Sequence, residues 1–181
     1  ELAAIAAAGA SDVDHSNNTN LQSVVLALGL ATNKPIARHS AWRYNDKGLN
    51  LHDGPWTSAD YYDGHWGVGP GPLGYGDPWI VTTNSFGPDA NRKYPCLYYR
   101  SSFTLDEIPL SMTMLVARDD GVAVYLNGAE AVLDSLDAPT AYTNLATATA
   151  SGTAESNYVA YAVDTSLLRV GLNIVAAEVH Q

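Results

Sequence analysis

The sequence predicts an all-β protein: an antiparallel β-sandwich with an N-terminal extension strand. Short apolar–polar alternations recur along the second half of the chain. They are spaced roughly 8–12 residues apart, the rhythm of a sandwich. No long amphipathic helical pattern competes with these alternations.

The strands are clearest from residue 97 onward. Residues 97–105 alternate apolar with polar side chains, which indicates a strand buried on one face. Segments 122–126 and 129–133 flank Asn127 and Gly128, a type I′ hairpin signal because both central residues must adopt positive φ. The other strands expected here span residues 112–116, 158–163 and 172–179.

Length and charge limit the classes of function. The 181 residues fit one domain, which we place at 36–181 after an extension at 1–35. The net charge of −10 disfavours nucleic acid and anionic membranes, which both select Lys and Arg. The same charge tolerates neutral glycans and attracts divalent cations. No apolar run reaches the ~18 residues of a membrane span.

The chemistry-bearing residues predict a protein that is not an enzyme. The five histidines lack metal-type spacing, and neither a nucleophile elbow nor a phosphate loop is present. The pairs His52-Asp53 and Asp63/His65 fit surface loops more simply than a metal site. Cys96, the only cysteine, fits a small buried hydrophobe better than a nucleophile and allows no intrachain disulfide.

All four tryptophans lie in the Gly- and Pro-rich stretch 36–96. Aromatic side chains among such loops plug the end of a sandwich or form a platform on which sugar rings stack. We expect Trp42 and Trp66 to be plugs, whereas Trp56 and Trp79 remain open to either role.

Five motifs follow one another in order along residues 36–181. They are SAWRY (40–44), WGVGPGPLGYGD (66–77), YRSSF (99–103), RDDGVAVYLNG (118–128) and NIVAAEVHQ (173–181). The series resembles the jelly-roll, galactose-binding-like β-sandwich module appended to secreted bacterial phosphoesterases, glycoside hydrolases and adhesin-like surface proteins. The resemblance implies an extracellular, non-catalytic accessory module. By analogy, the candidate sugar-stacking residues are Trp56, Tyr61, Tyr62 and Trp79.

The turn at Asp119 and Asp120 also resembles the Asp-Asp turn of protective-antigen-type lectin domains. In those domains the paired aspartates hold a Ca²⁺ ion that in turn holds sugar hydroxyls. The resemblance makes Asp119 and Asp120 candidate calcium ligands, although Ca²⁺ takes six to eight oxygens. The alternative is a solvated turn whose Asp side chains cap backbone N–H groups.

Members of this family continue past the EVHQ strand through a polar turn into one more strand. Here a segment of that type lies at residues 17–30 instead. We therefore expect a sandwich with one vacant strand position, whose open edge is a template for pairing. The candidate donor residues are Leu21, Val24, Val25, Leu26, Leu28 and Leu30.

The donor at 21–30 has two ways to fill the vacancy. It folds back onto its own domain, or it enters the next copy by donor-strand complementation and builds a head-to-tail, pilus-like filament. The sequence thus predicts a structural subunit that binds copies of itself. The alternative is a carbohydrate-binding, lectin-like module, with Ca²⁺ as its candidate cofactor.

Overall fold

The computed structural model describes residues 4–6, 26–28 and 34–181. The chain divides into two compact units, Glu1–Lys34 and Pro35–Gln181, one residue before the boundary expected from sequence. In the first unit, β1 (Ala4–Ala6) pairs antiparallel with β2 (Leu26–Leu28).

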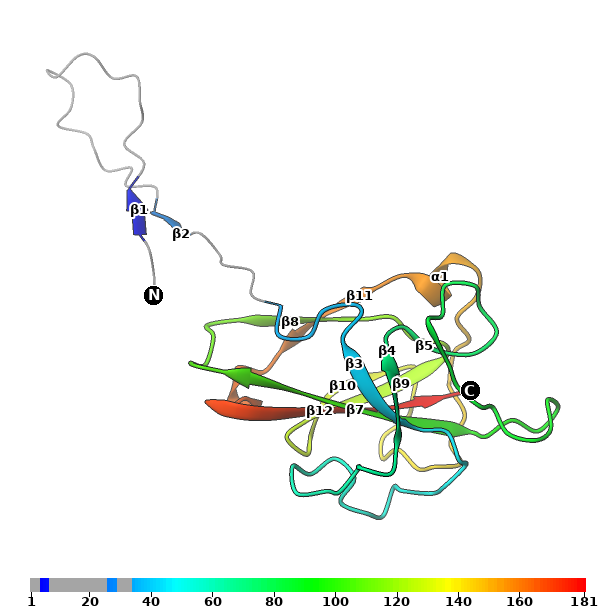
Figure 1. The fold of residues 1–181 in the computed structure, drawn as a ribbon. Helices are drawn as coiled ribbons and strands as arrows, with labels where there is room; N and C mark the ends of the chain where they lie inside the picture. Colours follow the sequence, from blue (N-terminus) through cyan, green and yellow to red (C-terminus); the bar gives the residue numbers. More distant parts are fainter. Residues whose placement is uncertain (1–3, 7–25, 29–33) are drawn as a thin grey trace, which may run out of the picture. The chain divides into compact units, whose positions relative to one another are not determined.

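The second unit is built on a six-stranded antiparallel sheet, the main sheet (Figure 1). In spatial order its strands are β10 (Ala129–Asp134), β9 (Gly121–Leu126), β12 (Gly171–His180), β7 (Cys96–Leu105), β3 (Ala41–Asn45) and β4 (Gly67–Pro70). The C-terminal strand β12 lies between β7 and β9 and pairs with both. The long β7–β12 pair runs through the middle of the sheet, so it sets the register of the whole layer.

A second, smaller layer consists of β8 (Met112–Val116) and β11 (Val159–Val163), paired antiparallel (Figure 1). The short strands β5 (Leu73–Gly74) and β6 (Thr82–Thr83) form a parallel pair. The helical segments are one turn each, α1 (Thr153–Ser156) and the 3₁₀ segment Thr165–Leu167. The chain is therefore an all-β antiparallel sandwich. In the described part of the chain, no helix has the length and apolarity needed to cross a membrane.

The main sheet buries side chains on both faces. Successive side chains of a strand point to opposite faces. One face carries a mainly aliphatic core that packs on β8 and β11. This first core consists of Phe103, Leu105, Val122, Val124, Leu126, Val132, Val163, Leu168 and Val175. The opposite face carries a second, aromatic core of Trp56, Trp66, Cys96, Tyr98 and Ala176.

The second core corrects the expectation for strand 97–105. Alternation predicted one buried face, yet Cys96 to Arg100 are all buried. The cause is the long loop between β3 and β4, which lays Trp56 and Trp66 on the face that was expected to meet solvent. Such coverage depends on a distant segment, so local periodicity does not reveal it.

Arg100 holds this loop onto the sheet. Its side chain is 3% exposed, and its Nε lies 2.8 Å from Asp63 Oδ2. Its other guanidinium nitrogens donate to the backbone carbonyls of Trp56 and Ser58. A buried charge is stable only when it is paired and hydrogen-bonded, so these contacts fix the loop in one position.

The expected hairpin is confirmed. Asn127 and Gly128 have φ values of 52° and 93°. They join β9 to β10, with Leu126 opposite Ala129.

Candidate functional sites

The first candidate site is the edge of the second layer. β8 pairs with β11 on one side, and within the described residues no strand pairs along its other side. Met112, Met114 and Val116 pack against the first core but stay half-buried, whereas Leu115 on the opposite face of β8 is 58% exposed. An unpaired strand beside a half-covered core is suited to accept another strand.

The structure describes only part of the predicted donor segment. Leu26 and Leu28 belong to β2, where they lie opposite Ala6 and Ala4 of β1. Leu21, Val24, Val25 and Leu30 lie outside the described residues. In the structure β2 therefore pairs with β1, and its donation to another copy stays a prediction.

Burial removes Trp56 from the predicted sugar platform. Trp56 is 3% exposed and meets Tyr98 and Tyr125 edge-to-face, with ring centroids 4.8 and 5.5 Å away. A ring enclosed in this way has no free face for a sugar, so Trp56 is a core residue. Trp66 is 5% exposed in the same core, and Trp42 is half-buried against the first core.

Tyr61 lines a groove of about 360 Å³, which also has polar side chains in its wall, among them Arg43, Asp63 and Ser102. Tyr62 is 77% exposed. The Asp63 carboxylate lies 3.2 Å from Arg43 Nε and is also bound by Arg100. This carboxylate is committed to two guanidinium groups, which explains Asp63 without a metal.

Trp79 lies elsewhere, in the wall of a cavity of about 70 Å³ that Tyr75, Asp77 and Asp119 also line. One predicted sugar residue and one predicted calcium ligand therefore share a cavity. The four predicted stacking residues do not form a single platform. Trp56 lies in the aromatic core, Tyr61 in the groove and Trp79 in this cavity, and the exposed Tyr62 lines none of the three.

The two aspartates of the turn differ in their surroundings. Asp120 Oδ1 accepts a hydrogen bond of 2.7 Å from the Ala150 N–H, as in the capping alternative. Burial, a hydrogen bond to Asp120 and the negative charges of Asp120, Glu155 and Asp77 raise the pKa of Asp119 to about 6. The calcium assignment stays a prediction.

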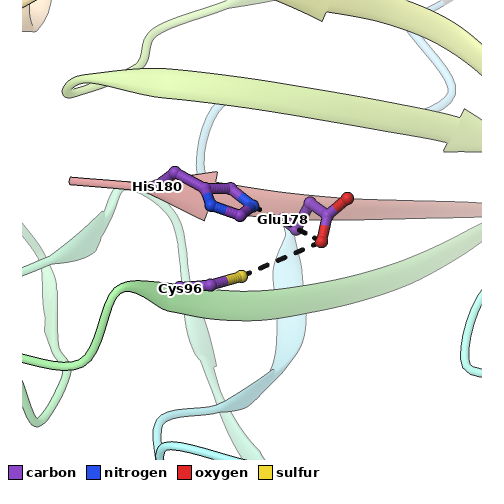
Figure 2. Close-up of side chains that lie close together, drawn as sticks. All are labelled: Cys96, Glu178 and His180. Carbon is purple, nitrogen blue, oxygen red and sulfur yellow. Dashed lines mark hydrogen bonds and ion pairs between the residues drawn. The ribbon is translucent and has the colours of Figure 1, made fainter. Parts of the chain in front are cut away.

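Sequence reasoning did not foresee a further site, formed by Cys96, Glu178 and His180 (Figure 2). Cys96 and His180 are opposite each other in the β7–β12 register, and Glu178 lies two residues before His180 on the same face. Their exposed fractions are 1%, 0% and 0% for Cys96, Glu178 and His180. Glu178 Oε2 lies 3.9 Å from Cys96 Sγ and 3.5 Å from His180 Nε2.

Neighbouring groups hold this cluster in place. The Tyr125 hydroxyl donates to Glu178 Oε1 at 2.6 Å, and His180 Nδ1 lies 2.8 Å from the Asn144 carbonyl oxygen. His180 Nε2 has no hydrogen-bond partner. His52 Nδ1, from the loop between β3 and β4, lies 4.0 Å from Glu178 Oε2. Burial, followed by the charge of Glu178, raises the pKa of the Cys96 thiol.

No protein-family model and no curated protein matches this chain. Among solved structures, 82% of it aligns with 17% of a β-glycosidase from Bacteroides vulgatus, at 18% identity and a TM-score of 0.47. A β-glucuronidase from Bifidobacterium dentium, in complex with coumarin-3-O-glucuronide, aligns with 78% of it at 16% identity and a TM-score of 0.46. That alignment covers 19% of the glucuronidase. At these scores neither similarity transfers an activity or a substrate to this chain.

Proposed function

We propose that this protein is a non-enzymatic, extracellular structural subunit whose sandwich accepts residues 21–30 of another copy along β8. The observation that carries the proposal is the unpaired edge of β8 beside Met112, Met114 and Val116, which are only half-buried.

The proposed donor segment has apolar side chains at alternate positions, as a strand that pairs with β8 and covers the core needs. Val24, Leu26, Leu28 and Leu30 fall on one face of an extended strand because they alternate along the chain. Each would bury its side chain against the incomplete core, a gain of roughly 1.5–3 kcal/mol per residue. The strand would also pair the backbone groups that β8 leaves open.

Donation between copies is favoured over donation within one chain. The link of residues 31–36 between the donor and the sandwich is short, and Pro35 stiffens it, which favours reaching a neighbouring copy. A segment donated to the next copy repeats head to tail, and such contacts generate open filaments unless the rotation closes them into a ring.

Mixing two defective chains tests this proposal. The double change Leu26→Asp and Leu28→Asp disables the donor, and Met114→Asp disables the acceptor. Each variant alone should stay monomeric by light scattering and electron microscopy, whereas an equal mixture should give heterodimers without long polymers.

Matched changes serve as controls. Asn18→Asp with Asn20→Asp adds the same charge to the extension, and Leu115→Asp adds charge to the exposed face of β8. Both controls should still polymerise. A wild-type chain that remains monomeric at high concentration, or a donor-defective chain that still polymerises, would refute the proposal.

Carbohydrate binding is the second candidate function, and the groove beside Tyr61 favours it. Its volume, about 360 Å³, falls within the range of small-ligand sites, and it combines an aromatic ring with polar groups. Tyr61→Ala should weaken binding to any glycan found on an array at least tenfold, whereas Tyr158→Ala should not. Silence of the wild-type chain on the array, with and without Ca²⁺, would exclude this function.

A further inference from the structure

We propose that Cys96, Glu178 and His180 bind a divalent transition metal, of which zinc is the best match, between strands β7 and β12. The site is independent of strand acceptance, because it lies on the opposite face of the main sheet from β8. Cysteine, histidine and glutamate supply sulfur, nitrogen and oxygen, the ligand set of zinc sites. Ca²⁺ and Mg²⁺ prefer oxygen ligands alone.

The distances suit a single tetrahedral ion. Zinc bonds of about 2.3 Å to sulfur and about 2.0–2.1 Å to nitrogen and oxygen place the ligand atoms roughly 3.3–3.6 Å apart. Here Glu178 Oε2 lies 3.5 Å from His180 Nε2 and 3.9 Å from Cys96 Sγ. These two distances are within a few tenths of an ångström of the zinc values, and all three ligand atoms lie within 4.8 Å of one another.

The orientation of His180 is the second, independent observation. The Asn144 carbonyl oxygen can only accept, so the facing Nδ1 carries the ring hydrogen. In the neutral ring, the lone pair of Nε2 then points at Glu178 Oε2, which also presents lone pairs. Facing lone pairs repel, and a proton or a metal ion between these atoms relieves the repulsion. A metal bound to Nε2 with Nδ1–H donating to a carbonyl is a common arrangement of histidine ligands.

The buried charge of Glu178 also supports a bound cation. Glu178 is fully buried, and its recorded ion-pair partners are His52 and His180. An uncompensated carboxylate in such a place is strongly destabilising. A divalent ion would balance Glu178 together with a Cys96 thiolate.

The surroundings fit a metal site as well. The Tyr125 hydroxyl orients Glu178 through its other oxygen, and the Asn144 carbonyl orients His180. Such outer contacts fix the geometry of metal ligands. His52 Nδ1, 4.0 Å from Glu178 Oε2 on a side chain that is 30% exposed, is the candidate fourth ligand and marks the route from solvent.

Metal analysis of the untagged full chain tests the proposal. After equilibration with zinc and gel filtration, we expect about one zinc ion per chain. Zinc at 100 times its dissociation constant should raise Tm by about 5–10 °C relative to chelator-treated protein. With Co²⁺, tetrahedral d–d bands and a thiolate charge-transfer band should appear.

Cys96→Ser should abolish the charge-transfer band, and His52→Gln, which alters a partly exposed loop residue, should weaken zinc binding about 10–100-fold. His65→Gln, in an exposed loop position, is the matched control and should bind like the wild type. Substoichiometric zinc with no change in Tm would overturn the proposal and leave a proton on His180 as the cation. A wild-type cobalt complex without thiolate absorption would also overturn it, whatever the folding of the variants.

Discussion

At the scale of single residues, the main sheet buries two opposite charges on one face and compensates them differently. Arg100 is bound by the Asp63 carboxylate and by backbone carbonyls of the covering loop. Glu178 is surrounded by Tyr125, His180, His52 and a thiol. In both places polar contacts, in addition to apolar packing, fasten loops to the sheet.

Asp63→Asn should destabilise the fold by about 3–5 kcal/mol, because it leaves the Arg100 guanidinium buried without its counterion. Asp60→Asn removes an exposed carboxylate from the same loop and should change stability by less than about 0.5 kcal/mol. Urea unfolding of both variants measures the difference. Equal stabilities would mean that Arg100 draws its compensation from the carbonyls alone.

Asp119 should make stability depend on pH. Its pKa is raised from 3.8 to about 6 in the folded state, so folding favours the protonated carboxyl. The resulting stabilisation is complete below pH 4 and is lost as the pH rises through 6. Because the side chain is partly exposed, Asp119→Asn should stabilise the protein at pH 7 by only about 1 kcal/mol or less. The gain over wild type should vanish near pH 4, and a gain that is constant with pH would contradict this account.

At the scale of elements, the β9–β10 hairpin shows how much a local motif anticipates. Two residues, Asn127 and Gly128, fixed the turn and the strands on either side. The Asn127 side chain does more than the turn requires, because it donates to Leu167 O and Asn173 Oδ1 and accepts from the Ile174 N–H. It therefore joins the hairpin to β12.

Asn127→Ala should cost about 2–4 kcal/mol, since it places alanine at a φ of 52° and leaves these hydrogen bonds unmade. Gly128→Ala should cost only about 1 kcal/mol, because a Cβ there meets nothing nearer than Thr57 Oγ1 at 3.9 Å and only the positive φ is strained. Thermal unfolding measures the loss of stability in both variants, and Glu130→Ala, which alters an exposed residue of the same hairpin, serves as the control. If Asn127→Ala and Gly128→Ala lost the same stability, backbone strain alone would account for both losses and the Asn127 hydrogen bonds would contribute nothing.

At the scale of the whole molecule, sequence patterns anticipated the fold class but not what covers each face. Period-2 alternation is local, so the strands and the hairpin could be predicted from short segments. Trp56 is buried because the loop between β3 and β4 packs on the main sheet. Cys96 lies opposite His180 because of the register in which β7 pairs with β12. One signal was available: Glu178 and His180 are two residues apart on a strand and must share a face. Their partner Cys96, on a strand far away in the chain, could not be identified without the pairing.

The proposed assembly predicts a stability that depends on protein concentration. A strand bound only by the folded acceptor stabilises that acceptor by mass action. Val24, Leu26, Leu28 and Leu30 together would contribute roughly 6–12 kcal/mol before the cost of ordering the strand is subtracted. At roughly 2–4 °C per kcal/mol for a chain of this size, the wild type should melt at least about 5 °C above the chain carrying Leu26→Asp and Leu28→Asp. Its Tm should rise on concentration while that of the variant stays constant, and a peptide of residues 19–33 should raise the Tm of the variant. If the wild type and the variant have the same Tm at every concentration, β8 does not gain a strand from a second copy.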